Sequence, residues 1–111
     1  MAEVVSITRS AEALTVPFKP VEIARANDAV VRLARLDGEF LWHAHDEDEL
    51  FLCWSGSFEI EIEGQPPVPM RVGDVLVVPI GVRHRPRADQ GPAYALVLER
   101  PESLQYGNPA R

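Results

Sequence analysis

The sequence predicts an all-β protein, a small jelly-roll β-barrel. Ten prolines and seven glycines divide 111 residues into short segments rich in valine, isoleucine, leucine and phenylalanine, and turns at such intervals are typical of sandwiches and barrels. Residues 58–63 alternate apolar and acidic side chains, which is the two-residue period of a half-buried strand. Because no long segment with a helical period competes, we expect roughly eight strands with hairpin-like connections.

The N-terminal residues 1–27 are predicted to form an arm outside the barrel. Ser10 can cap a single helical turn at residues 10–14. Pro17 and Pro20 favour an extended chain after it, because the residue before a proline avoids the helical region. We expect one domain over residues 1–111, with a barrel core at about 28–100 and an irregular C-terminal tail at 101–111.

The barrel strands follow from the apolar runs between the turns. Residues 64–69 contain three prolines, which lack the N–H that a central strand needs, so this run is expected to be a turn. Residues 75–78 are apolar at both alternations, which predicts a strand covered on both sides. The predicted strands are residues 30–36, 40–45, 50–54, 58–63, 75–78 and 93–99.

Size and charge restrict the possible partners. A domain of this length folds with a modest margin, so a second subunit that covers apolar surface would help, and we expect a homodimer. The formal net charge of −6 argues against nucleic acid, because phosphate backbones are bound by positively charged surfaces. A small-molecule ligand is the expected partner.

The cellular compartment of the protein is predicted from its N-terminal residues and from its cysteine content. Glu3 stands where a signal peptide would carry positive charge, and no apolar run approaches membrane-spanning length. The only cysteine, Cys53, lies in an apolar run and is expected to be a small buried side chain, without a disulfide framework. These features predict a cytoplasmic protein without a membrane partner.

The three histidines of the chain, together with one glutamate, predict a metal site. His43 and His45 are two residues apart, so on a strand both rings point to the same face. Glu49 follows an acidic turn and can fold back beside them. His84 follows a Pro-Ile-Gly turn that could bring a third ring to the cluster. Imidazole and carboxylate are ligands for divalent transition metals.

These residues resemble the two motifs of the cupin family. The first motif combines a glycine, a His-x-His pair, a glutamate and a further glycine, and the second combines a glycine, Pro-x-Gly and a histidine. The matching residues are Gly38, His43, His45, Glu49 and Gly56 for the first motif, and Gly73, Pro79, Gly81 and His84 for the second. A lone His-x-His pair would be weak, whereas two motifs with matching spacing are specific.

The match departs from the family pattern at two positions, neither of them a candidate ligand. Four residues rather than five separate Gly38 from His43, and Ala88 stands where the second motif often has asparagine. The resemblance implies a small single-domain cupin of the kind loosely labelled mannose-6-phosphate isomerase-like, with a double-stranded β-helix fold. It also implies that His43, His45, Glu49 and His84 bind the metal.

Some neighbouring residues allow two interpretations. Glu47 is an alternative carboxylate ligand, but Glu49 has the motif spacing to Gly56. The arginines at positions 83, 85 and 87 could form an anion clamp, yet their alternation with His84 predicts an outward, charged face. Trp54 has the opposite parity to Glu49 and is a candidate for a dimer interface, whereas Phe51 and Cys53 share that parity and should line the barrel interior.

The expected function is that of a metal-dependent enzyme acting on a small polar molecule, isomerase-like or dioxygenase-like. Three imidazoles and one carboxylate leave up to about two positions open on an octahedral ion. The ion could be Fe, Mn, Ni, Zn or Cu, because mixed nitrogen and oxygen ligands suit all of them. Two alternatives are a non-catalytic module that binds or senses a small ligand, and a metal-free, epimerase-like barrel in which the histidines perform acid–base chemistry.

Overall fold

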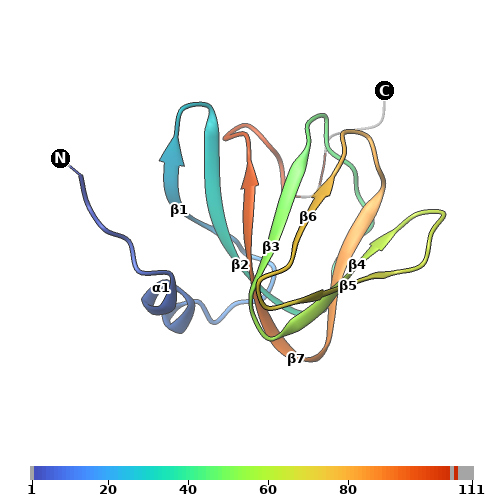
Figure 1. Ribbon diagram of the computed structural model, residues 1–111, viewed down its shortest axis with the longest axis horizontal. Coiled ribbons are helices and arrows are strands. Elements are labelled where there is room, and N and C mark those ends of the chain that lie inside the picture. The colour runs from blue at the N-terminus through green and yellow to red at the C-terminus, as the bar shows by residue number, and fades with distance from the viewer. Residues whose placement is uncertain (1, 106, 108–111) are drawn as a thin grey trace.

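The computed structural model describes residues 2–105 and 107, and within them the chain forms one short helix and seven antiparallel strands (Figure 1). The helix α1 spans Ile7–Ala13 and packs against β2. The strands are β1 Val21–Ala26, β2 Ala29–Glu39, β3 Glu49–Ser55, β4 Ser57–Ile62, β5 Val68–Arg71, β6 Val75–Val78 and β7 His84–Glu99. The predicted all-β jelly-roll fold is confirmed.

The longest strand, β7, joins the two halves of the barrel. Its second half pairs with β2 and β3, which gives the strand order β1-β2-β7-β3-β6. Its first half also pairs with β2, at Arg87 and Ala88, but has β4 in place of β3 on its other side, and β4 in turn pairs with β5. The buried core lies between the halves and includes Phe51, Phe58, Ile60, Met70 and Val78.

Gly56 allows the chain to pass from one half of the barrel to the other. It lies between β3 and β4 with φ of +73°, a conformation that residues with a Cβ rarely adopt. A Cβ at this position would lie 2.9 Å from the Pro92 carbonyl oxygen and 3.1 Å from the Ala93 Cα. Both conformation and space therefore require glycine here, at the position that the sequence motif marks.

Four local predictions are wrong. The turn expected at residues 64–69 is shorter, because β5 begins at Val68 and includes Pro69, which pairs with Glu59. The helix begins at Ile7 with Ser6 as its N-cap, which accepts a hydrogen bond from the Arg9 N–H, so Ser10 is inside the helix. Residues 40–45 are not a strand, because only His43 makes a β-bridge. The strand at 75–78 exists as β6 but is covered on one side only, since it lies at the sheet edge with Val75 and Val77 about half exposed. In addition, residues 21–26 of the predicted N-terminal arm form β1 and join the sheet beside β2.

The two terminal segments differ in their contacts with the barrel. The N-terminal segment before α1 extends away from the barrel (Figure 1), and the Val4 side chain is 99% exposed. At the other end, the Arg32 guanidinium donates hydrogen bonds to the carbonyls of Pro101 and Ser103. Tyr106 and residues 108–111 of the predicted tail lie outside the described residues. No helix in the described part of the chain is long and apolar enough to cross a membrane.

Candidate metal centre

Backbone hydrogen bonds place His43 directly opposite His84. His43 N donates to His84 O at 3.0 Å, and His84 N donates to His43 O at 2.9 Å, which forms an isolated antiparallel bridge. Side chains of paired residues in such a bridge lie on the same face. The two ring centroids are accordingly 4.5 Å apart.

The loop after His43 places the other two side chains. Gly81 N donates to the His45 carbonyl at 2.9 Å, and Ile80 N donates to Asp48 Oδ1 at 2.8 Å. The acidic turn is thus attached to the turn that precedes His84. Glu49 then begins β3 with its side chain directed into the barrel, the same parity as buried Phe51.

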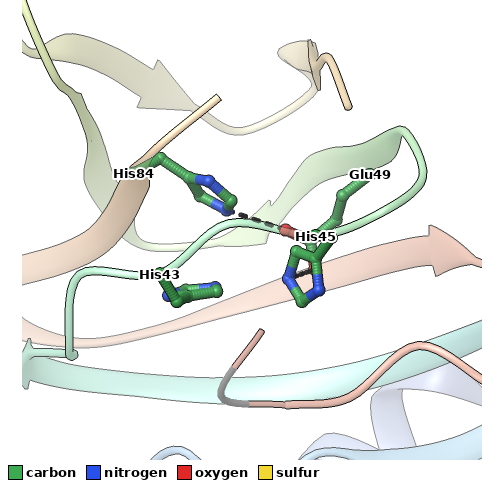
Figure 2. Close-up of side chains that lie close together, drawn as sticks. All are labelled: His43, His45, Glu49 and His84. Atoms are coloured by element: carbon green, nitrogen blue, oxygen red, sulfur yellow. Dashed lines mark hydrogen bonds and ion pairs between the residues drawn. The ribbon is translucent and has the colours of Figure 1, made fainter. Parts of the chain in front are cut away.

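The structure brings all four predicted side chains to one point (Figure 2). Their candidate ligand atoms all lie within 4.8 Å of one another, and each residue is less than 10% exposed. Glu49 bridges two rings, with Oε1 2.9 Å from His84 Nε2 and Oε2 3.4 Å from His45 Nε2. Donor atoms around an ion with bonds of about 2.0–2.2 Å are at most about 4.4 Å apart. Small side-chain adjustments would therefore close this cluster around a metal.

The hydrogen bonds of His84 require a proton or a metal ion between its Nε2 atom and Glu49. Nδ1 lies 2.9 Å from the Val82 carbonyl oxygen, and Nε2 lies 2.9 Å from Glu49 Oε1. Both partners are acceptors, and a neutral imidazole can donate from one nitrogen only. Because the ring is fully buried, either a second proton or a metal ion must satisfy the contact with Glu49.

The other two histidines have nitrogen atoms free to bind an ion. His43 Nδ1 donates to the Leu41 carbonyl at 2.7 Å, which leaves the lone pair on Nε2. Burial lowers the pKa of His43 to about 4, so this ring is neutral at pH 7. His45 Nδ1 has no hydrogen bond to any described residue, and Nε2 has none beyond its 3.4 Å ion-pair contact with Glu49. Buried polar atoms are rarely left without partners, so the donor set fits a bound cation.

Glu99 is a further buried acid at the site that the sequence analysis missed. Its carboxylate is paired with the Arg32 guanidinium at 2.7 Å and neighbours Glu49. Burial, followed by the negative charge of Glu49, raises the pKa of Glu99 to about 7. Because the two negative charges would repel each other, this pair of carboxyl groups carries a single negative charge more readily than two. The sequence did contain a signal for this residue, because Glu99 has the same inward parity as Ala95 and Val97 in the predicted strand 93–99.

The remaining candidate residues lie outside the cluster. Glu47 accepts a hydrogen bond from the Ser103 hydroxyl at 2.5 Å and is not among the converging ligand atoms. Arg85 and Arg87 form ion pairs with glutamates of β4, which include Glu61 for both arginines. Arg83 pairs with Glu63. The outward, charged face is therefore the arrangement observed for these arginines.

The cupin domain family matches residues 29–99, more than half of the sequence. The chain belongs to the cupin family. A cupin-2 domain protein from Shewanella frigidimarina NCIMB 400 superposes with a TM-score of 0.82 and 30% identity, over 87% of this chain and 94% of that chain. Cupins typically bind a metal, and the buried cluster of three histidines and one glutamate lies within the matched residues.

Two further proteins, one known by sequence and one by structure, are similar to this chain. An uncharacterized protein of Bacillus subtilis strain 168, YdbB, is 39% identical over 67 residues, which are 60% of this chain and 59% of that protein. The match thus spans less than two thirds of that relative's length. Hydroquinone 1,2-dioxygenase from Sphingomonas sp. TTNP3, solved with 4-nitrophenol, has a TM-score of 0.81 and 18% identity, over 88% of this chain and 32% of that chain. At this identity the likeness shows a shared fold.

A small pocket of this cupin opens beside the cluster. Its inner space is about 60 Å³, and His43 and Glu49 form part of its wall. The other lining residues come from the barrel interior and from segments on both sides of the matched domain: Phe18, Pro20, Ala34, Leu36, Phe40, Phe51, Pro86, Val97, Glu99 and Gln105. A ligand in this pocket would therefore touch the candidate metal ligands directly.

Proposed function

We propose that this cupin is a metal-dependent enzyme whose substrate is a small molecule with a polar, metal-coordinating group. Its reaction would be of the dioxygenase or isomerase type, and His43, His45, Glu49 and His84 would hold the ion. The observation that carries the proposal is the convergence of these four buried donors beside an open pocket. A structural metal site would be closed by its ligands, whereas a site that meets a pocket can admit a substrate.

The ion is proposed to be Fe, Mn, Ni, Zn or Cu, because the donor set consists of nitrogen and carboxylate oxygen atoms. Such an ion, when bound, supplies Lewis-acid or oxygen-activating chemistry. The residues of this chain supply the rest. The Nδ1 contacts of His43 and His84 with backbone carbonyls fix the ring orientations. The apolar pocket wall excludes water from the reacting group.

Glu99 favours an enzyme over a module that only binds a ligand. It lines the same pocket as His43 and Glu49, and its pKa of about 7 lets the carboxyl group both give and take a proton near neutral pH. A passive binding site has no need for such a group. We therefore assign Glu99 the proton-transfer role in the proposed reaction.

The proposed function is tested with protein purified without an affinity tag. Elemental analysis should find close to one transition-metal ion per chain, and a substrate screen with sugars, keto acids and phenols should give turnover that a chelator abolishes. Less than about a tenth of an ion per chain after reconstitution would instead support the metal-free barrel. Stoichiometric metal with tight ligand binding and no turnover would support the binding module.

Zinc affinity is expected to decrease as the pH falls from 8 to 6. Burial disfavours a charge on His45, but the Glu49 carboxylate outweighs burial and raises the pKa of His45 above its ordinary value of about 6.5. His45 is therefore protonated before His43, whose pKa is about 4. Below the pKa of His45, the dissociation constant should rise about tenfold per pH unit, because one proton must leave for each ion bound.

Isothermal titration calorimetry at pH 6, 7 and 8 measures this dependence. The His45→Gln variant is the control, because it removes the titrating ring, and its weaker affinity should vary less with pH. An unchanged zinc affinity of the parent protein between pH 8 and pH 6 would contradict the assignment of His45.

We further propose that the protein is a homodimer, formed through what we name the outer apolar face. This face consists of two rows of side chains that cross five strands. The first row is Ala24, Val31, Leu98, Leu50 and Val77, and the second is Val21, Leu33, Leu96, Leu52 and Val75. An antiparallel sheet with one face on the core normally carries polar residues on the other.

The helix α1 contacts β2 on this side but leaves Val75, Val77 and Leu98 between 42% and 54% exposed. A second copy would cover these side chains with an equally flat and apolar surface, since two sheets pack face to face. Trp54, 38% exposed on the outward side of β3, would lie at the edge of this interface. A cytoplasmic location completes the proposal, and the buried free thiol of Cys53 is typical of a reducing compartment.

Val77→Lys and Leu98→Lys are each expected to convert the dimer to a monomer, because each places a charge among the exposed side chains of the outer apolar face. Light scattering coupled to size-exclusion chromatography should then give 12.3 kDa in place of twice that mass. Val72→Lys is the matched control, since Val72 is 65% exposed and lies off the face. A parent protein that elutes as a monomer would refute the dimer.

A further inference from the structure

The pocket beside the candidate metal site has an almost entirely apolar wall. Eight of its twelve lining residues are apolar, and the four polar ones are His43, Glu49, Glu99 and Gln105. Among the residues that the structure describes, no lysine or arginine lines it. The bound ion would therefore be the one cation that an anionic ligand meets here, and the Glu49 and Glu99 carboxyl groups offset part of its charge.

Two of the three phenylalanines of the wall stack on each other, and hydrogen bonds also hold the backbone of Phe18 in place. The rings of Phe18 and Phe40 stack with centroids 5.1 Å apart and an interplanar angle of 26°. Phe18 N donates to the Arg35 carbonyl at 2.9 Å, and the Gln105 side-chain amide donates to the Phe18 carbonyl. Phe18 also has φ of +57°, a strained conformation for a residue that is not glycine. Such strain persists only where the surroundings enforce it, and it is frequent at ligand-binding sites.

This part of the wall lies outside the residues that the family model matches. The family match covers residues 29–99, whereas Phe18, Pro20 and Gln105 lie outside it. The segment around Phe18 and the segment around Gln105 meet at the pocket through the hydrogen bond described above. The metal ligands lie within the matched residues, whereas the wall near Phe18 lies outside them, so we take this wall to be the part of the site that distinguishes one substrate from another.

The size of the pocket limits the ligand as well. A space of about 60 Å³ holds about four to six water-sized groups, because each needs about 10–15 Å³. A sugar phosphate is several times larger and carries charge that the wall does not compensate. A six-membered ring matches the upper end of this range and can contact Phe18 and Phe40, while its one polar group extends beyond the apolar space to the metal ligands at the pocket wall.

From these features we infer that the substrate is a small, uncharged molecule with an apolar, ring-like body, and that Phe18 is the residue that selects it. The inference rests on the proposed function, because the polar group of the substrate is taken to meet the bound ion. It predicts that phosphorylated sugars and carboxylates bind in this pocket more weakly than an uncharged ring does.

Calorimetric titration of the zinc-loaded full-length protein with phenol, benzoate and mannose 6-phosphate tests the inference. Phenol should bind at least tenfold more tightly than either anion. Benzoate offers the better metal-binding group, so a preference for phenol can come only from the pocket wall. Equal or tighter binding of benzoate or mannose 6-phosphate would overturn the inference, and so would the absence of phenol binding.

Variants at Phe18 test the selecting residue. Phe18→Ala should weaken phenol binding at least fivefold, while Phe18→Leu, which keeps an apolar wall, should stay within about twofold of the parent. Val16→Ala is the matched control, because Val16 is in the same segment and half exposed. Unchanged phenol binding in Phe18→Ala would overturn the role of Phe18, and if this variant does not fold, the ranking of the three ligands on the parent protein decides.

Zinc is titrated into the same samples before the ligands. The metal site and the inferred substrate class are thereby tested separately. Zinc binding without a preference for phenol refutes the inferred substrate class and leaves the metal site standing. Failure of the parent protein to bind zinc refutes the proposed function, and the inference with it.

Discussion

His84→Ala is expected to weaken zinc binding by at least about 100-fold. Loss of residues that merely support a ligand already costs about 10- to 100-fold in metal affinity, and His84 is one of four proposed ligands with a fully buried ring. The barrel should stay folded, because the hydrogen bonds that hold this position are made by the backbone of His84 to His43. Competition with a chromophoric chelator measures the affinity, and circular dichroism checks the fold.

A pair of glutamate variants provides the control for this experiment. Glu49→Gln removes the proposed carboxylate ligand and should weaken zinc binding to a similar extent. Glu47→Gln changes the neighbouring acid, which lies outside the cluster and accepts a hydrogen bond from Ser103, and should leave the affinity within about twofold. If His84→Ala bound zinc as tightly as the parent, or if Glu47→Gln had the larger effect of the two, the ligand assignment would be wrong.

Zinc loading is expected to raise the melting temperature by about 15 °C. An ion present at a thousand times its dissociation constant stabilises the folded state by about 4 kcal/mol, provided that it does not bind the unfolded chain. For a domain of this size, each kcal/mol raises the melting temperature by about 4 °C. Differential scanning calorimetry with zinc, and then with excess chelator, measures the gain and its loss.

The same scan on His84→Ala separates a specific site from general zinc binding. This variant keeps the surface carboxylates of the parent but lacks the proposed fourth ligand, so zinc should raise its melting temperature by only a few degrees. A parent protein whose melting temperature is unaffected by zinc or by the chelator would show that the cluster holds no ion in solution.

Strands with one face on the apolar core and the other on the charged surface were predictable from their sequence. The alternation at residues 58–63 predicts β4 to within one residue, because Phe58 and Ile60 face the core while Glu59 and Glu61 face Arg85 and Arg87. The same local reasoning failed at residues 75–78. A run that is apolar on both sides fits a covered strand, yet β6 lies at an edge of the sheet and leaves Val75 and Val77 about half exposed.

The stretch from Phe40 to His45 shows a similar limit. Its residues suit a strand, but hydrogen bonding to His84 and Gly81 holds it as a loop with one bridge. The bridge nevertheless directs the His43 ring to the side that strand geometry predicts. The prediction of the ligand cluster therefore survived an error in the secondary structure, since the motif spacing encodes the position of the rings rather than the type of backbone around them.

The sequence by itself determined the barrel fold, the family and the four side chains that converge, because alternation, turn residues and motif spacing are local properties of the chain. The tertiary structure alone decided what surrounds those side chains. Glu99 reaches Glu49 from the far end of β7, and Phe18 and Gln105 meet over the pocket from opposite ends of the chain. Such contacts depend on the closure of the barrel, which brings distant segments together without leaving a periodic trace in the sequence.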